Sequence, residues 1–564
     1  MYEYVYYADK ELDFPLSSNI LVTNSNKEIE DEDFIVSNSK DIHAQHIAFE
    51  IDYYINHSKD KIAQKIKNIE KLYDISASRF DLSKEMLYSQ DVANKVLLVC
   101  SDEEKREFLK KSLPDEFDLF HVPANIIKKI TGHIGNLSVT VDDDGKNVEI
   151  QVDQIVWFDA LQIALNQSGT QDPKESSIDD VLANLRENIN FYEYKKYTIY
   201  DKTICQYDGR REEICSKCED VCPTVAITKD DATKTLSFSQ IDCKGCGGCI
   251  SVCPSGALEY APSGRDSIFE MAKFFKGHIP LILPQIMEID TLDVDLKENV
   301  LPFVIDGEKF LHEGTLLTLL QESGSQVVFY TSILSKGTKD SISILNQIYQ
   351  KKYGLDAVLL ASTKDELKKA LEEVQFVEGS RFTFNEDEGR KRELFAIRLS
   401  HIVGNEDLGE VTTGEHVHYG QVKVNADNCT LCLVCVGSCN VDALQADASD
   451  NTLRINPSLC TSCGYCEVSC PESDCLTIER DVIKLQPAWF KESILAQDEL
   501  FACVECGVDF ATVKSVEKIA AIMGPKFAHD PVKERSLYCC TDCKPKIMMQ
   551  SFYDKNKGAS HAKQ

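Results

Sequence analysis

Two features of exported and membrane proteins are missing from this sequence. The stretch MYEYVYYADKELDF at the N-terminus has no basic segment followed by an apolar run, which a secretory signal requires. No run of about 18 apolar residues, the length that suggests a membrane span, occurs in the chain. We therefore expect a cytoplasmic protein without a membrane span. Thiols stay reduced in that compartment, so the cysteines are not expected to form a disulfide framework.

Basic residues are scarce. The chain has 61 Lys and Arg against 92 Asp and Glu, which leaves a net charge of −31. A broad basic face that would neutralise phosphate groups is missing, so we expect no binding to nucleic acid. The acidic excess suits a solvated surface, and it also suits docking to a basic patch on a partner protein.

Motifs for nucleotide, haem and hydrolase chemistry are absent as well. No G-x-x-x-x-G-K-[ST] occurs, no G-x-G-x-x-G follows a predicted strand, and neither G-x-S-x-G nor C-x-x-C-H is found. The sequence contains no general base, nucleophile or open metal position that we can identify. We therefore expect the chain to catalyse no reaction of its own.

Cysteine is what the sequence has in excess, with 23 residues, most of them in four short runs. The runs are TICQYDGRREEICSKCEDVC, CKGCGGCISVC, CTLCLVCVGSC and CTSCGYCEVSC. Cys222 and Cys243 are 21 positions apart, and so are Cys439 and Cys460. This equal spacing indicates that one module of two runs is duplicated.

The spacing within the runs predicts [4Fe–4S] clusters. Four thiolates must converge on a core a few ångströms across, and gaps of two residues let a tight loop wrap three of its corners. In two-cluster ferredoxins the fourth cysteine of each run ligates the other cluster. The four expected ligand sets are Cys205, Cys215, Cys218 and Cys253; Cys243, Cys246, Cys249 and Cys222; Cys429, Cys432, Cys435 and Cys470; and Cys460, Cys463, Cys466 and Cys439. Zinc would need only two C-x2-C pairs and would leave the other cysteines of each run without a purpose.

Two departures from the usual pattern affect individual ligands. Asn440 follows the fourth cysteine of its run, where proline is usual, but that proline supplies no ligand, so we expect the cluster to form. The nine-residue gap between Cys205 and Cys215 makes Cys205 the least secure ligand, and without it the site would hold a three-iron cluster or a cube with an exposed iron. Cys100 and Cys475 lie outside the pattern, and we expect both to be small buried residues.

A further metal site is predicted near the C-terminus. ACVECGVDF and YCCTDCKPK supply two C-x2-C knuckles, separated by the helical stretch SVEKIAAIM. We expect Cys503, Cys506, Cys540 and Cys543 to form a closed zinc-ribbon-like site of structural type, with iron as the alternative metal. By spacing alone, Cys539 is an alternative to Cys540.

The remaining sequence alternates apolar strand-like runs with helical patterns, as in open parallel sheets. GHIGNLSVTVDDDGKNVEIQV is predicted to form a hairpin with an Asp-Gly turn. We expect an α+β multidomain chain. Its predicted parts are an α/β domain over 1–190, a 2[4Fe–4S] ferredoxin module over 195–262, an α/β domain without a cofactor motif over 265–405, a second ferredoxin module over 416–485, a four-cysteine zinc-ribbon-like module over 498–550 and a flexible tail over 551–564.

In this order of parts the chain resembles polyferredoxin-type iron–sulfur proteins encoded beside formate dehydrogenases in proteobacteria. The resemblance rests on the long gap before CSKCEDVC, on CTLCLVCVGSC and on CVECGVDFATVKSVEKI with CTDCK. The segment 265–405 is also distantly similar to the delta subunit of methyl-viologen-reducing hydrogenase, but it lacks that family's cysteines, so no [2Fe–2S] cluster is expected there.

What the resemblance implies is an electron carrier or wiring subunit for a molybdenum- or tungsten-dependent formate dehydrogenase or a similar redox enzyme. The alternative is an accessory factor that assembles such a dehydrogenase, for which an exposed thiol or a labile cluster would be needed. A scaffold whose clusters are structural is a third possibility, but one zinc would do that work with fewer ligands. The number of predicted clusters favours electron transfer.

Overall fold

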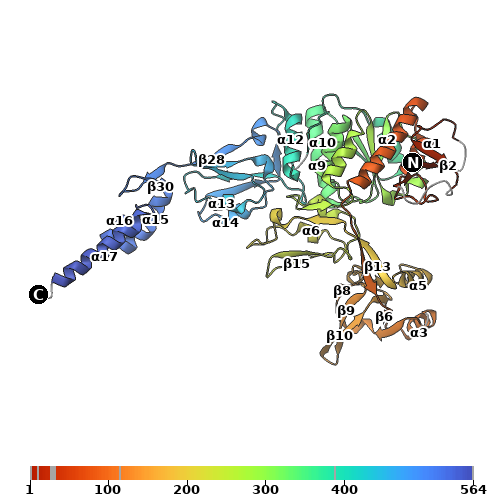
Figure 1. Cartoon of the computed structure of the whole chain (residues 1–564), viewed down its shortest axis with the longest axis horizontal. Coiled ribbons are helices and arrows are strands. Elements are labelled where there is room, and N and C mark those ends of the chain that lie inside the picture. The colour runs from red at the N-terminus through yellow and green to blue at the C-terminus, as the bar shows by residue number, and fades with distance from the viewer. Residues whose placement is uncertain (1–2, 9–11, 26–33, 114–115, 387–388, 562–564) are drawn as a thin grey trace. The chain divides into compact units, whose positions relative to one another are not determined.

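The structure is a computed structural model that describes residues 3–8, 12–25, 34–113, 116–386 and 389–561. The chain divides into two compact units, Met1–Gly389 and Arg390–Gln564. In Figure 1 the first unit runs from red to green and the second from teal to blue. No helix in the described part of the chain combines the length and apolar character needed to cross a membrane.

The first unit begins with a small parallel sheet and two helices. Its strands are β1 (Tyr4–Tyr7), β2 (Ile20–Thr23), β3 (Val36–Ser37) and β4 (His46–Ile47), in the order β2-β1-β3-β4. Helices α1 (Glu50–His57) and α2 (Ile62–Asp81) follow. The buried face of α2 includes Ile69, Leu72 and Tyr73 at helical spacing, and the Tyr73 hydroxyl donates to the carbonyl of Val5 at 2.8 Å.

Residues 87–195 form three further sheets. A parallel sheet has the order β12-β11-β6-β7, an antiparallel sheet the order β10-β9-β8, and β13 pairs with β5. The strands are β5 (Leu87–Val92), β6 (Lys95–Val99), β7 (Asp118–Val122), β8 (Ile127–His133), β9 (Asn136–Asp143), β10 (Lys146–Val152), β11 (Gln154–Trp157), β12 (Thr170–Gln171) and β13 (Asn190–Lys195), and the helices are α3 (Glu103–Ser112), η2 (Ala124–Ile126), α4 (Gln162–Leu165) and α5 (Ile178–Glu187). The predicted Asp-Gly hairpin is confirmed as β9 and β10, which turn through Asp144 and Gly145 at positive φ.

A second parallel sheet has the strand order β19-β18-β20-β21. Its elements are α8 (Arg265–Lys273), β18 (Ile279–Pro284), η4 (Gln285–Met287), η5 (Ile289–Thr291), β19 (Val300–Ile305), α9 (Glu313–Ser323), β20 (Val327–Tyr330), α10 (Lys336–Tyr353), β21 (Val358–Ala361) and α11 (Lys364–Glu373). All residues of β18, β19 and β20 are buried, as expected for strands covered on both faces. Because β18 lies between β19 and β20, the strand order reverses at β18.

The first two helices and the loop between them contact this second sheet. The Tyr53 hydroxyl of α1 donates to the carbonyl of Val294 at 2.8 Å, and the backbone N–H of Asn299 donates to Asp60 at 2.9 Å. Residues of the predicted 1–190 domain therefore belong to different sheets, and Tyr53 and Asp60 contact residues that lead into β19 of the middle segment. The domain boundaries themselves stay a prediction.

Each cysteine module contains two antiparallel strand pairs, two short α-helices and one 3-10 helix. The first has β14 (Thr198–Tyr200) with β17 (Leu258–Tyr260), β15 (Ile227–Asp230) with β16 (Thr235–Phe238), and η3 (Lys202–Ile204), α6 (Lys217–Asp220) and α7 (Gly248–Val252). The second has β23 (Gly420–Val424) with β26 (Leu476–Arg480), β24 (Leu444–Asp447) with β25 (Thr452–Ile455), and α13 (Val434–Ser438), η6 (Pro457–Leu459) and α14 (Tyr465–Ser469). The duplication deduced from the cysteine spacing is thus repeated in the secondary structure.

The second unit adds elements around its module. These are α12 (Lys391–Val403), β22 (Glu410–Thr412), β27 (Val482–Lys484), η7 (Pro487–Phe490), β28 (Ser493–Gln497), β29 (Leu500–Ala502), β30 (Asp509–Thr512), α15 (Val513–Phe527), α16 (Pro531–Ser536) and α17 (Cys543–His561). Helix α12, which lies inside the predicted 265–405 segment, belongs to this unit, where Phe395 contacts Tyr419 with ring centroids 5.5 Å apart. Most of the predicted tail, 551–561, continues α17.

Candidate metal centres

The loop 243–249 carries three of the four cysteines predicted to hold one cluster. Gly245 and Gly247 both have positive φ, at 68° and 78°, and they separate the three cysteines of the loop. A Cβ on Gly247 would lie 2.4 Å from the Cβ of Phe310, so only glycine fits there. Helix α7 begins directly after this turn with Gly247 as its N-cap residue.

A cavity lies against this loop. Its lining includes the four thiols predicted to hold one cluster, Cys222, Cys243, Cys246 and Cys249, and its empty volume is about 470 Å³ including its mouth. Burial raises the pKa of Cys249 far above its usual value, and the charges of Cys243, Cys246 and Cys222 add to this rise. Four thiols that repel one another's charge in an apolar setting are a donor set that a cationic iron core would stabilise.

The looser first run is brought together in the same way. Burial and the nearby thiols of Cys253 and Cys205 raise the pKa of Cys215 to about 12, although a backbone N–H from Lys217 opposes the rise. The pKa of Cys218 is raised further by burial and by Cys253 and Cys215. The structure therefore groups the four thiols of this predicted set across the long gap.

Cys205 itself is well positioned for a ligand role. Its side chain is 8% exposed, and its sulfur accepts backbone N–H groups from Tyr207 at 3.4 Å and Asp208 at 3.5 Å. Backbone donors aimed at a ligand sulfur are typical of iron–sulfur sites.

The second module repeats the crosswise grouping in its first set. Burial and the neighbouring thiols of Cys429, Cys432 and Cys470 raise the pKa of Cys435 to about 12. Leu431 and Leu433 occupy the two positive-φ positions of this run, at 52° and 58°. For leucine such a conformation costs roughly 1–2 kcal/mol, so the loop is held in this shape by its surroundings. Cys432 is the exposed thiol of the set.

The other set of this module is more deeply enclosed. Burial raises the pKa of Cys460 to about 12, a backbone N–H from Ser462 opposes the rise, and the thiols of Cys463 and Cys439 add to it. That N–H donates to the Cys460 sulfur at 3.4 Å. Burial and the thiols of Cys460, Cys463 and Cys439 also raise the pKa of Cys466. The predicted four thiols are again neighbours.

Two cysteines outside the runs are buried, as expected. Cys100 follows β6 and is 4% exposed, and Cys475 is also 4% exposed. The thiol of Cys475 lies beside those of Cys429 and Cys470, and burial together with these two neighbours raises its pKa to about 12. This cysteine therefore adjoins the set that Cys429 and Cys470 are predicted to belong to.

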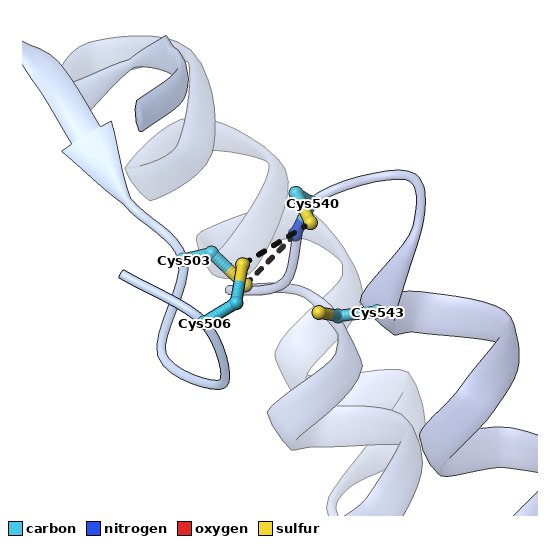
Figure 2. A group of neighbouring side chains, drawn as sticks. All are labelled: Cys503, Cys506, Cys540 and Cys543. Atoms are coloured by element: carbon cyan, nitrogen blue, oxygen red, sulfur yellow. Dashed lines mark hydrogen bonds between the residues drawn. The ribbon is translucent and has the colours of Figure 1, made fainter. Parts of the chain in front are cut away.

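The C-terminal site brings together the four predicted thiols. The Sγ atoms of Cys503, Cys506, Cys540 and Cys543 all lie within 4.8 Å of one another. In Figure 2 they converge from the β29–β30 turn, the loop before α17 and the first residue of α17. The Cys506 and Cys540 sulfurs are 3.8 Å apart. Four thiolates at the usual distance of about 2.3 Å from a tetrahedral zinc would be about 3.8 Å apart, so the spacing fits zinc, and tetrahedral iron is also compatible.

Backbone N–H groups stabilise the thiolate form of one of these cysteines, which is the form that binds a metal. Burial opposes ionisation of Cys503, but N–H groups of Cys540, Glu505 and Cys506 outweigh it and lower its pKa to about 6. The N–H of Cys540 donates to the Cys503 sulfur at 3.3 Å. Cys539 lies outside the group of four, and its thiol donates to the carbonyl of Arg535 at 3.4 Å.

Two tyrosines beside the cavity were not predicted by the sequence. Tyr197 and Tyr260 line it, and the Tyr260 hydroxyl donates to the carbonyl of Gly245 at 2.8 Å. Their place depends on the pairing of β14 with β17, which brings the two ends of the module together. No feature of the cysteine pattern could have indicated them.

Comparison with known families agrees with this description. A family model described as a 4Fe-4S dicluster domain matches residues 214–257, and a second of the same description matches residues 421–471. The first match begins at residue 214, so Cys205 and all but the last residue of the long gap lie outside it. No sequence among the curated proteins matches the chain. The two modules are ferredoxin-type 4Fe-4S domains, and the protein that carries them is an iron–sulfur protein with the features of an electron carrier.

Proposed function

We propose that the chain relays single electrons through four [4Fe–4S] clusters, to or from a formate dehydrogenase or a similar redox enzyme. The observation that supports it most is the crosswise grouping of the thiols. In each module the neighbours of one run's cysteines include the last cysteine of the other run, for example Cys470 beside Cys435 and Cys439 beside Cys460. This is the arrangement by which two-cluster ferredoxins hold two cubes in one fold.

The proposed ligands are the sixteen cysteines of the four sets. When bound, each cluster accepts and returns one electron. The protein's own residues supply the rest. The thiolates fix the clusters, backbone N–H groups such as those of Tyr207 and Ser462 stabilise charge on the sulfurs, and the apolar core around the second module excludes water. On this proposal the chain is an electron-transfer subunit and the partner enzyme is the catalyst.

The acidic surface is proposed to lower the reduction potentials of the clusters and to select the partner protein by its charge. With a net charge of −31, each added electron is disfavoured, so we expect low midpoint potentials. Midpoints well above about −250 mV, within the range open to such clusters, would contradict this expectation. The same charge favours a partner whose docking surface is basic.

The C-terminal site is proposed to be structural. Four thiolates leave no open coordination position, so a zinc ion there would stabilise the packing of the β29–β30 turn against α17 without taking part in electron transfer. Iron is the alternative metal at this site. The expected metal content per chain is therefore sixteen irons in clusters and one zinc.

The link to formate dehydrogenase rests on the sequence resemblance, and its test is an anaerobic pull-down of the tagged protein from its own host. Formate is then added, and the visible absorption of the clusters is followed. Co-purification of a dehydrogenase catalytic subunit, with bleaching within its turnover time, would support the relay. A Cys463→Ser variant should bleach less than the wild type, and Cys100→Ser, which alters a buried thiol outside the runs, serves as the matched control.

The contrary outcomes are distinct. If the dehydrogenase is present but the clusters stay oxidised, the chain does not carry its electrons. If only an immature form without its molybdenum or tungsten cofactor is bound, the protein acts in assembly.

A further inference from the structure

The middle parallel sheet contacts the first ferredoxin module through the edge at which such sheets usually bind ligands. In open α/β sheets, ligands bind beyond the carboxyl ends of the strands, where the strand order reverses. Here that reversal lies at β18, between β19 and β20. The segments that follow β19 and β20 both contact the run 243–253, so this edge is covered by the module itself.

After β19, residues 306–310 lie directly on the loop of one cluster set. The N–H of Lys309 donates to the carbonyl of Cys246 at 2.9 Å. Phe310 is 1% exposed, stacks on Tyr260 with ring centroids 4.6 Å apart, and occupies the space that a side chain at Gly247 would need.

After β20, the start of α10 contacts α7, the short helix of the run 243–253. The hydroxyls of Ser335 and Ser251 are 3.1 Å apart, and a Cβ on Gly337 would lie 2.6 Å from the Ser251 hydroxyl. Ser251 is fully buried there. Two segments of the α/β sheet therefore fix the position of α7 relative to the sheet.

The segment after β19 also brings a pair of charges to the cluster set. The Lys309 Nζ lies 3.4 Å from the Glu308 carboxylate, and both side chains are largely buried, with 27% and 17% exposed. The aliphatic part of Lys309 runs along Gly248, where its Cδ would be 3.8 Å from an added Cβ. The charged pair therefore lies beside the loop that supplies three thiols of this cluster set.

The second module has a comparable pair at the equivalent position. Gly464 stands four residues after Cys460, as Gly247 stands four residues after Cys243. A Cβ on Gly464 would lie 3.1 Å from the guanidinium of Arg480, which pairs with Glu467 at 2.6 Å. In that module the pair comes from the module's own β26 and α14. In the first module it comes from the α/β sheet.

We propose that the α/β sheet sets the reduction potential of the cluster held by Cys222, Cys243, Cys246 and Cys249, with Lys309 and Glu308 as positioning residues. Reduction adds one negative charge to the cluster, so Lys309 favours the reduced form and Glu308 the oxidised form. Because the two charges are paired, replacing either residue leaves the other charge unbalanced beside the cluster. This inference rests on the proposed electron-transfer function.

The test is a redox titration of the full-length protein, followed by EPR, in two variants that keep side-chain size. Lys309→Met should lower the equilibrium constant for reduction at one cluster by about tenfold, a shift of about 59 mV to more negative potential for a one-electron couple. Glu308→Gln should shift the same step in the positive direction. Lys351→Met removes the same charge at the far end of α10, where the side chain is exposed, and should leave all four steps unchanged.

The outcomes separate this inference from the function on which it rests. Opposite shifts of one step in the two variants, with the full iron content retained, support it. Variants that carry all their iron but show no shift, or a Lys351→Met shift equal to that of Lys309→Met, overturn it and leave the electron-transfer proposal standing. A wild-type protein that binds no [4Fe–4S] clusters overturns both.

Discussion

Gly247→Ala should selectively destabilise one cluster site. The position has φ of 78°, where an alanine costs roughly 1–2 kcal/mol. The added methyl would also lie 2.4 Å from the Cβ of Phe310, well inside the ordinary separation of about 3.5–4.0 Å, so the loop or Phe310 must move. Overpacking of this kind typically costs about 1–3 kcal/mol. The total is therefore about 2–5 kcal/mol, concentrated on the loop that supplies three thiols.

A matched control separates the two contributions. Gly354 has nearly the same φ, 74°, but nothing lies within 4 Å of an added Cβ, so Gly354→Ala carries only the conformational cost. Hydrogen exchange at the amides of 243–253, together with iron content after a chelator challenge, measures the effect locally. We expect Gly247→Ala to lose about a quarter of the cluster iron, the share of one cube among four, and Gly354→Ala to lose none. If Gly247→Ala keeps all its iron and its local protection, the close packing of Phe310 on the loop is not as described.

Four further substitutions test individual residues. Asn440→Pro should keep the EPR signal of every cluster, since residue 440 supplies no ligand, and loss of a signal would show that its backbone donor is needed. Cys205→Ser should convert one cube to a three-iron form and lower the iron content, whereas an unchanged spectrum would remove Cys205 from the ligand set. Cys503→Ser should release the single C-terminal metal and lower the melting temperature of that module while all cluster signals remain, and Cys539→Ser should retain the metal. A variant of Cys539 that loses the metal would exchange the roles of Cys539 and Cys540.

The grouping of the cysteines was predictable because most of the candidate ligands are close in sequence. Gaps of two residues leave the chain few ways to turn, so the runs of Cys243 and Cys460 both form a loop followed by a short helix. Equal spacing between runs likewise predicted the repeat of the strand pairs. The C-terminal group followed from two knuckles of the same kind, even though Cys506 and Cys540 lie 34 positions apart.

Long-range contacts were not predictable from the spacing. The gap of nine residues before Cys215 left the role of Cys205 open, and only the folded module brings Cys205 near Cys215 and Cys218. The contact of Cys475 with Cys429 and Cys470 likewise arises from the way the two runs fold back on each other. Nothing in the sequence around Lys309 marks it as a neighbour of Cys246.

The sequence by itself determined which cysteines are candidate metal ligands, how often the module is repeated and which motifs are missing, because each of these depends on residue type and local spacing. Only the tertiary structure decided what surrounds each candidate cluster site. The segment 306–310 reaches the loop 243–249 because β19 ends at the edge of the sheet that faces the module, and that position results from the packing of the whole sheet. For this reason the charges beside Cys246 come from Glu308 and Lys309, which are distant from it in the chain.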